Sequence, residues 1–99
     1  MKVQVSEERF ERLIIKVLRG MNIDNLYRAA ISFTKDKETG EIKKAAVGLF
    51  FDIVRESAFF HNIQKDVLNM LESIFGIEFF VITIPYSEAK YHLNAPRNI

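Results

Sequence analysis

The chain has 99 residues, of which 48% are hydrophobic and 27% are charged, and its formal net charge at neutral pH is +1. This composition is typical of one globular domain and excludes a disordered or collagen-like chain. A net charge so close to zero creates no field over the whole surface, so affinity for nucleic acid would have to come from local clusters of basic residues. Because a domain of this size buries only about 60% of its unfolded surface, we expect any functional site on the surface, at an edge or between subunits.

The sequence contains no cysteine, which excludes disulfides, zinc-thiolate sites and cysteine nucleophiles. This agrees with a reducing compartment, and we expect a cytoplasmic protein. Residues 1–6 lead directly into a charged segment, and the longest apolar run, residues 77–86, is interrupted by Glu78 and Thr83. A bilayer span needs about 20 apolar residues. We therefore expect neither a signal peptide nor contact with a membrane.

The first 21 residues predict a short strand followed by an amphipathic helix. Residues 1–5 alternate between apolar and polar side chains. Ser6 has the side chain of an N-cap, and acids follow it in the first turn, where the helix dipole favours them. We expect Gly20 to end the helix. The apolar positions recur every three or four residues and predict a buried stripe, formed by Phe10, Leu13, Ile14, Val17, Leu18 and Met21.

From Tyr27 the hydrophobic period changes to two, which predicts a β-hairpin. The segment 36–41 is polar, and its Gly40 can adopt the positive φ of a bulged turn. A register that joins the apolar faces of both strands is available, and a slip by one residue would expose both faces. These faces consist of Tyr27, Ala29, Ile31 and Phe33 on the first strand, and Ala45, Val47, Leu49, Phe51 and Ile53 on the second.

A second helix is predicted over about Ser57–Phe75, ended by Gly76, and a last strand follows over residues 77–84, ended by Pro85. We expect residues 86–99 to form one helical turn and a flexible end. The second helix has a predicted buried stripe of Phe60, Ile63, Val67, Met70, Leu71 and Ile74.

The predicted order is (β)αββαβ within a single α+β domain, residues 1–99. If residues 1–5 pair, this is a ferredoxin-like two-layer sandwich, with two helices on one face of a 3–4-stranded antiparallel sheet. If they do not pair, the order αββαβ is also compatible with KH-like folds. Those domains clamp nucleic acid with a GXXG loop, and none of the four glycines, at 20, 40, 48 and 76, forms such a pair.

The last strand is apolar on both faces, with Phe79 and Val81 on one side and Phe80 and Ile82 on the other. Such a strand needs cover on two sides, either from the C-terminal tail or from a partner, because exposed apolar patches mark interfaces. We therefore predict a small non-enzymatic protein-binding module with a regulatory or accessory role. It is expected to form a homodimer, or to bind another protein, through the open sheet face or the last strand. The predicted interface residues are Phe50, Phe80, Ile82, Ile84 and Tyr86.

A nucleic-acid-binding surface is the alternative prediction. Basic side chains fall within a narrow arc of the first helix, and two lysines follow the hairpin turn; such a row can track a phosphate backbone. Glu8 precedes Arg12 by four residues, which favours an ion pair on an ordinary solvated helix face. The residues of this alternative are Arg9, Arg12, Lys16, Arg19, Lys43 and Lys44.

Residues 44–51 can be aligned with the third-strand octamer of RNA-recognition domains, which stack bases on aromatic side chains. Lys44, Leu49 and Phe51 agree with that pattern. The two stacking positions, however, are Ala46 and Gly48. Base stacking by this mechanism is therefore not predicted.

The residues suited to catalysis are few. His61 lies near Asp52 and Glu56 in the sequence, so a small acid–base cluster before the second helix is a third hypothesis. His92 is the only other imidazole. Neither histidine belongs to a known catalytic or metal-binding motif. We predict no catalytic residue, no cofactor and no metal site.

Overall fold

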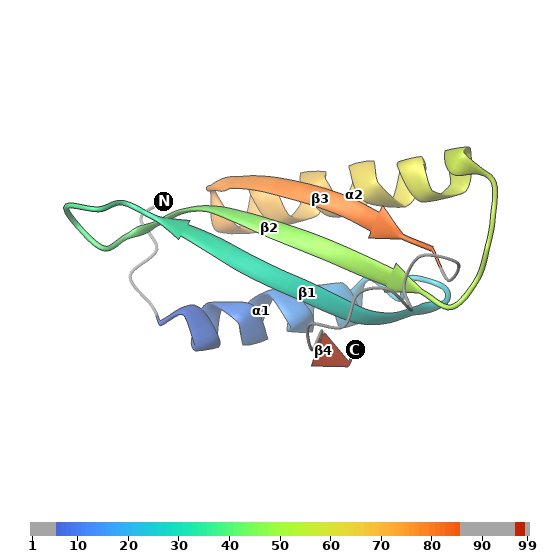
Figure 1. Cartoon of the computed structure of the whole chain (residues 1–99), viewed down its shortest axis with the longest axis horizontal. Coiled ribbons are helices and arrows are strands. Elements are labelled where there is room, and N and C mark those ends of the chain that lie inside the picture. The colour runs from blue at the N-terminus through green and yellow to red at the C-terminus, as the bar shows by residue number, and fades with distance from the viewer. Residues whose placement is uncertain (1–5, 86–96, 99) are drawn as a thin grey trace.

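The structure is a computed structural model that describes residues 6–85 and 97–98. These residues form an α+β domain in which two helices lie on one side of a mixed sheet (Figure 1). The elements are α1 (Glu7–Gly20), β1 (Leu26–Lys35), β2 (Ile42–Phe51), α2 (Ser57–Phe75), β3 (Glu78–Ile84) and β4 (Arg97–Asn98).

Helix α1 begins as the sequence predicts, because the side chain of Ser6 accepts a hydrogen bond from the backbone N–H of Arg9 at 3.2 Å. Its end differs from the prediction. Gly20 is still helical, Met21 is the C-cap, and the first left-handed residue is Asn22, with φ of 52°. An asparagine tolerates this conformation better than most residues, so the helix did not need a glycine to stop.

The predicted hairpin is confirmed in both register and facing. Strands β1 and β2 pair antiparallel, and the pairs Ala29 with Leu49, Ile31 with Val47 and Phe33 with Ala45 join the two apolar faces on the helix side of the sheet. Because side chains alternate along a strand, the even-numbered residues face the other way. Arg28, Ser32 and Thr34 are exposed there.

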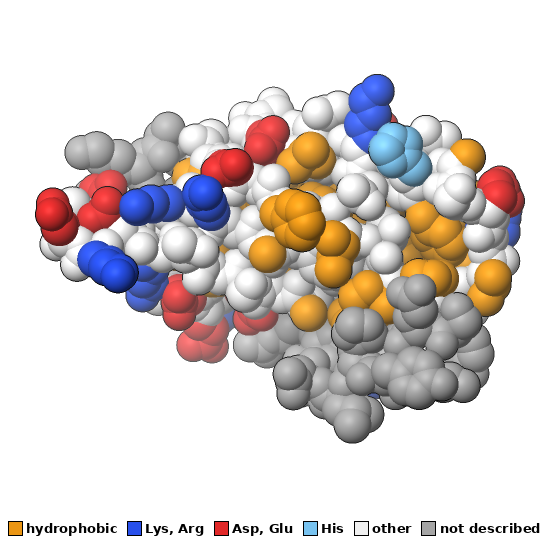
Figure 2. Space-filling model, turned by 45° about the horizontal axis from the view of Figure 1, so that its top comes forward, with side chains coloured by type: hydrophobic (Ala, Val, Ile, Leu, Met, Phe, Trp, Pro, Cys, Tyr) orange, Lys and Arg blue, Asp and Glu red, His pale blue; other side chains and the backbone are white. Residues whose placement is uncertain are grey.

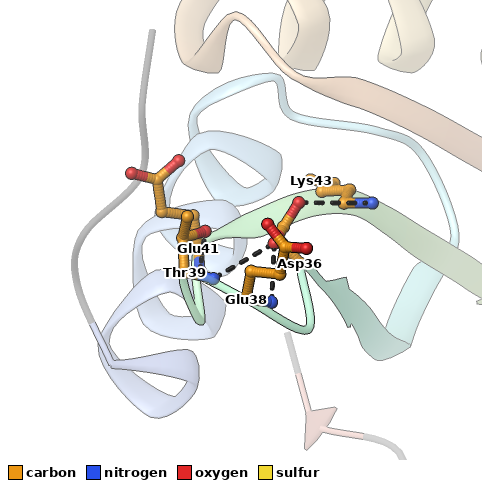
Figure 3. A network of polar contacts seen from close by, with 5 residues as sticks. All are labelled: Asp36, Glu38, Thr39, Glu41 and Lys43. Carbon is orange, nitrogen blue, oxygen red and sulfur yellow. Dashed lines mark hydrogen bonds and ion pairs between the residues drawn. The ribbon is translucent and has the colours of Figure 1, made fainter.

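Asp36 organises the turn between β1 and β2 (Figure 3). Its Oδ1 atom accepts hydrogen bonds from the backbone N–H groups of Glu38 at 2.8 Å and Thr39 at 3.1 Å. Lys43 Nζ lies 3.6 Å from Oδ2. The N–H of Thr39 first, then that of Glu38 and the charge of Lys43, lower the pKa of Asp36 below the ordinary 3.8. Gly40 supplies the positive φ that the turn requires, 75°.

The lowered pKa of Asp36 predicts an acid-sensitive turn. Since the folded chain binds this proton less readily than the unfolded chain, the stabilisation is complete above the ordinary value of 3.8 and is lost as the pH falls through the lower folded value. The unfolding free energies of the wild type and Asp36→Asn, measured with urea, should differ at about pH 6 and converge at about pH 2.5. A difference that stays constant across this range would contradict the role given to the ionised carboxylate.

Helix α2 has the predicted bounds, and Gly76 ends it in the left-handed region at φ 68°, with its N–H donating to the carbonyl of Glu72 at 2.9 Å. A Cβ is unfavourable in this conformation, so Gly76→Ala should cost about 1–2 kcal/mol of unfolding free energy. Gly20 is the matched control: it is helical, and an added Cβ there would meet nothing within 4 Å. Gly20→Ala should stabilise the protein by up to about 1 kcal/mol. Effects of the same sign in thermal denaturation would contradict this account.

The sheet has the order β3-β2-β1-β4, and β3 pairs with β2 in parallel. The prediction of an antiparallel sheet was therefore wrong. After β2, helix α2 returns the chain to the end where β2 began, so the next strand runs in the same direction and docks directly beside it. A ferredoxin-like order places another strand between these two and is not confirmed. Residues 1–5, predicted as a possible strand, lie outside the described residues.

The short strand β4 pairs antiparallel with β1 through Asn98 and Arg97, opposite Arg28 and Ala29. The sequence did not predict a strand in this segment. The helical turn and flexible end expected for residues 86–99 otherwise fall outside the described residues.

One apolar core lies between the helices and the sheet. Phe10 is 1% exposed, and its ring centroid lies 5.1 Å from that of Phe33 and 5.0 Å from that of Phe75. At the other end of the core, the rings of Phe51 and Phe60 meet at 5.2 Å. The largest fully buried side chains are Phe10, Phe51, Ile14, Leu18, Leu49, Leu71, Val47 and Val67.

Three residues predicted in the buried stripes are exposed. Leu13 is 40% exposed, Met70 42% and Ile74 43%, whereas Ile15 is buried at 7%. A helix that rests on a sheet buries only the arc that faces it, and at about 3.6 residues per turn these three lie at the margins of that arc. The prediction placed the arc of α1 too far toward Leu13.

Candidate protein interface

The sheet face opposite the helices carries the candidate site. Residues that lie side by side on β1, β2 and β3 form rows across this face: Thr34, Lys44 and Glu78; Ser32, Ala46 and Phe80; Ala30, Gly48 and Ile82; and Arg28, Phe50 and Ile84. Figure 2 shows that hydrophobic side chains gather over the middle of this side of the molecule, while Lys, Arg, Asp and Glu gather at the hairpin end.

The predicted interface residues divide into two groups. Phe80 is 67% exposed and Ile82 40% exposed; we call these two neighbours on the outermost described strand the β3 ridge. Phe50 and Ile84 are already buried, at 3% and 5% exposed, and pack together in a small separate cluster. Tyr86 lies outside the described residues. The surface available to a partner is thus narrower than predicted.

The β3 ridge stands beside a floor of small side chains. Ala46 pairs with Phe80, and Gly48 pairs with Ile82, so neither neighbour on β2 reaches as far from the sheet as the ridge does. A Cβ added at Gly48 would lie 3.5 Å from Ile84 Cδ1 and 3.9 Å from Ile82 Cγ1. The arrangement leaves the large side chains on β3 without apolar neighbours of equal height on β2.

The outer edge of β3 is the second feature of this site. The backbone N–H of Phe79 donates to the carboxylate of Glu72, on α2, at 3.1 Å. Strand β3 has β2 on one side and no strand on the other among the described strands. The sequence did not indicate this bond, because a contact between a side chain and a backbone group seven residues away follows no local pattern.

The lysines of the alternative prediction are each paired with an acid. Lys43 Nζ lies 3.6 Å from Asp36, and Lys44 Nζ lies 3.3 Å from Glu78. All of these groups are largely exposed, so the pairs contribute little stability, but they partly neutralise the hairpin.

The basic row on α1 is only partly free. Arg12 forms an ion pair with Glu8 at 3.0 Å, as its spacing predicts. Arg9, Lys16 and Arg19 are exposed and form no ion pair with the described residues. Helix α1 lies on one side of the sheet and Lys44 on the other. The structure therefore does not join the helix row and Lys44 into one continuous surface.

A cavity of about 240 Å³ lies on the helix side, beside the C-terminal end of α1. Its lining includes the carboxylates of Asp24 and Asp66 among apolar side chains: Met21, Ile23, Phe59, Ile63 and Val67. Ligand pockets commonly exceed about 300 Å³, so this cavity matches a side chain better than a cofactor.

The third hypothesis centred on His61. This residue is exposed, does not line the cavity, and makes no hydrogen bond or ion pair with the described residues. His92 lies outside the described residues. Among residues 6–85 and 97–98, no group of three or more His, Asp or Glu side chains is placed to hold a metal ion. No helix of that same part of the chain combines the length and the apolar character needed to cross a membrane.

Comparisons of the chain with models of protein families, with curated proteins and with solved structures found no match.

Proposed function

We propose that this chain is a small protein-binding module that forms a homodimer through β3. The observation that supports this function is the β3 ridge, because Phe80 is 67% exposed and its neighbour Ile82 40% exposed on the outermost described strand. Burying a side chain of this kind fully stabilises a protein by about 1.5–3 kcal/mol. Two such side chains left in water on one strand favour a surface that is covered by a partner.

A second copy of the chain suits this surface electrostatically. The charged row nearest to Phe80 contains Lys44 and Glu78, whose side chains lie 3.3 Å apart and neutralise each other. Between Glu78 and Pro85, β3 carries no charged residue. Two copies can therefore approach through β3 without facing like charges, and most soluble homo-oligomers are two-fold symmetric dimers.

The test is the mass of the protein in solution. Size-exclusion chromatography with light scattering, at tens of micromolar protein and above, should give a mass near twice the monomer mass of 11.5 kDa. Dilution should return the monomer. A strict monomer throughout this range would overturn the proposal.

Nucleic-acid binding through α1 is a second candidate, supported by the exposed and unpaired Arg9, Lys16 and Arg19. Lys16→Glu with Arg19→Glu should weaken binding to duplex DNA or RNA, and each lost phosphate contact should reduce the slope of log affinity against log salt by about 1. The matched control is Lys43→Glu, on the hairpin. Binding that is undetectable at low salt, or independent of salt, would reject this candidate.

A further inference from the structure

We infer that two copies pair edge to edge through β3, antiparallel, with the two-fold axis at Ile82, so that the two sheets become one. This inference rests on the proposed homodimer and specifies its geometry. It follows from the directions of the backbone groups on β3 and from the residues that close its edge at each end.

The bond between Glu72 and Phe79 shows which backbone groups of β3 point outward. Glu72 lies on the flank of α2 opposite Ile63, which faces the cavity beside α1. Its carboxylate reaches the outer edge of β3, where it accepts the N–H of Phe79 at 3.1 Å. Because backbone groups alternate in direction along a strand, the N–H and C=O groups of Val81 and Thr83 also point outward, away from β2.

The outer edge is closed at both ends. At the N-terminal end, the N–H of Phe79 is already bonded to Glu72. At the C-terminal end, the next outward residue after Thr83 is Pro85, which has no N–H to donate. The free part of the edge therefore consists of two residues, Val81 and Thr83, each with one donor and one acceptor.

Only a register centred on Ile82 uses all of these groups. It places Val81 opposite Thr83 of the second copy, and the reverse, which makes four hydrogen bonds. The next pair would be Phe79 opposite Pro85, where one donor is occupied and the other is absent. A register centred on Val81 would instead require the N–H of Phe79 and would break its bond to Glu72.

The same register covers the β3 ridge. Ile82 meets Ile82 of the second copy across the axis, and Phe80 lies opposite Ile84 of the second copy. Directly opposed residues of antiparallel strands have Cβ atoms about 5 Å apart, and pairs of aromatic and β-branched residues stabilise a sheet. An interface of two short strands is small, so we expect a dissociation constant in the range of about 1–100 µM.

Cysteine cross-linking tests the register, because the chain has no cysteine of its own. Ile82 and its copy form a non-hydrogen-bonded pair with Cα atoms about 4.5 Å apart, within the range of a disulfide. Ile82→Cys should therefore cross-link almost completely under mild oxidation at dimer-forming concentrations. Phe80→Cys is the matched control: the two copies of residue 80 lie four residues apart along the pair, about 13 Å, and should remain largely unlinked.

Proline substitutions test the direction of the backbone groups. Thr83→Pro removes an outward donor, which an edge strand tolerates, so the variant should fold and its dimer dissociation constant should rise at least tenfold. Ile82→Pro removes a donor directed toward β2 and should disrupt the monomer itself. Circular dichroism and light scattering measure both effects.

The outcomes separate this inference from the proposed function. A dimeric wild type in which Ile82→Cys links and Phe80→Cys does not supports the register. A dimeric wild type in which both variants link equally, or only Phe80→Cys links, overturns the register but leaves the homodimer in place. A wild type that is monomeric at every concentration overturns both.

Discussion

A Phe10→Ala variant should lose about 3–5 kcal/mol of unfolding free energy. Phe10 is 1% exposed, and its ring contacts the rings of Phe33, from β1, and Phe75, from α2. Its removal leaves a cavity where one helix, the sheet and the other helix meet. Few other side chains are placed to fill this space, because the Cα trace of α1 stays well separated from that of α2.

A domain of this size has a total stability of about 5–15 kcal/mol, so the variant should be marginally folded. Its melting temperature should fall by about 15 °C or more, as measured by calorimetry or circular dichroism. Phe80→Ala removes the same atoms from a side chain that is 67% exposed. In dilute, monomeric solution it should change the stability by no more than about 0.5 kcal/mol. Similar losses in the two variants would contradict the assignment of Phe10 to the core and Phe80 to the surface.

The local elements of this fold could be predicted from the sequence because their signals are local. The Ser6 cap, the change of hydrophobic period at Tyr27, the positive φ of Gly40 and the end of α2 at Gly76 each depend on a few neighbouring residues. The hairpin register was also predictable, since only one register joins the two apolar faces. These features position the open face of the sheet, where the β3 ridge lies.

The pairing of β3 was not predictable in the same way. Its alternation correctly separated Phe79 and Val81, which are buried, from Phe80 and Ile82, which are exposed. That pattern does not encode which strand lies beside it. The parallel docking onto β2 depends on the crossover through α2, and either neighbour would satisfy the same side-chain pattern.

The candidate site was predicted as a set of apolar residues but not as a shape. Phe50 and Ile84 are as apolar as Phe80 in the sequence, yet they are buried against each other within one chain. The bond from Glu72 to the edge of β3 gave no signal at all, because it joins groups that only the folded chain brings together. Sequence reasoning found the strand that carries the surface, and the tertiary contacts determine how much of it is free.

The variant Ile82→Lys should raise the dissociation constant of the dimer by about thirtyfold or more, since a residue at the centre of an interface commonly contributes about 2 kcal/mol or more. In the register inferred above, two lysines would face each other at the axis, and directly opposed like charges destabilise a sheet. The monomer should remain folded, because Ile82 is 40% exposed and a lysine side chain can extend into water. Sedimentation equilibrium measures the change.

Met70→Lys is the matched control for this experiment. Met70 is 42% exposed, close to the value for Ile82, but it lies on α2, on the other side of the sheet. If β3 forms the interface, Met70→Lys should leave the dissociation constant unchanged, and the introduced charge itself is then not the cause of dissociation. If instead Met70→Lys separates the dimer and Ile82→Lys does not, the interface lies on the helix side, where Leu13 and Ile74 are also exposed. The pair of variants thus assigns the interface to one side of the sheet or the other.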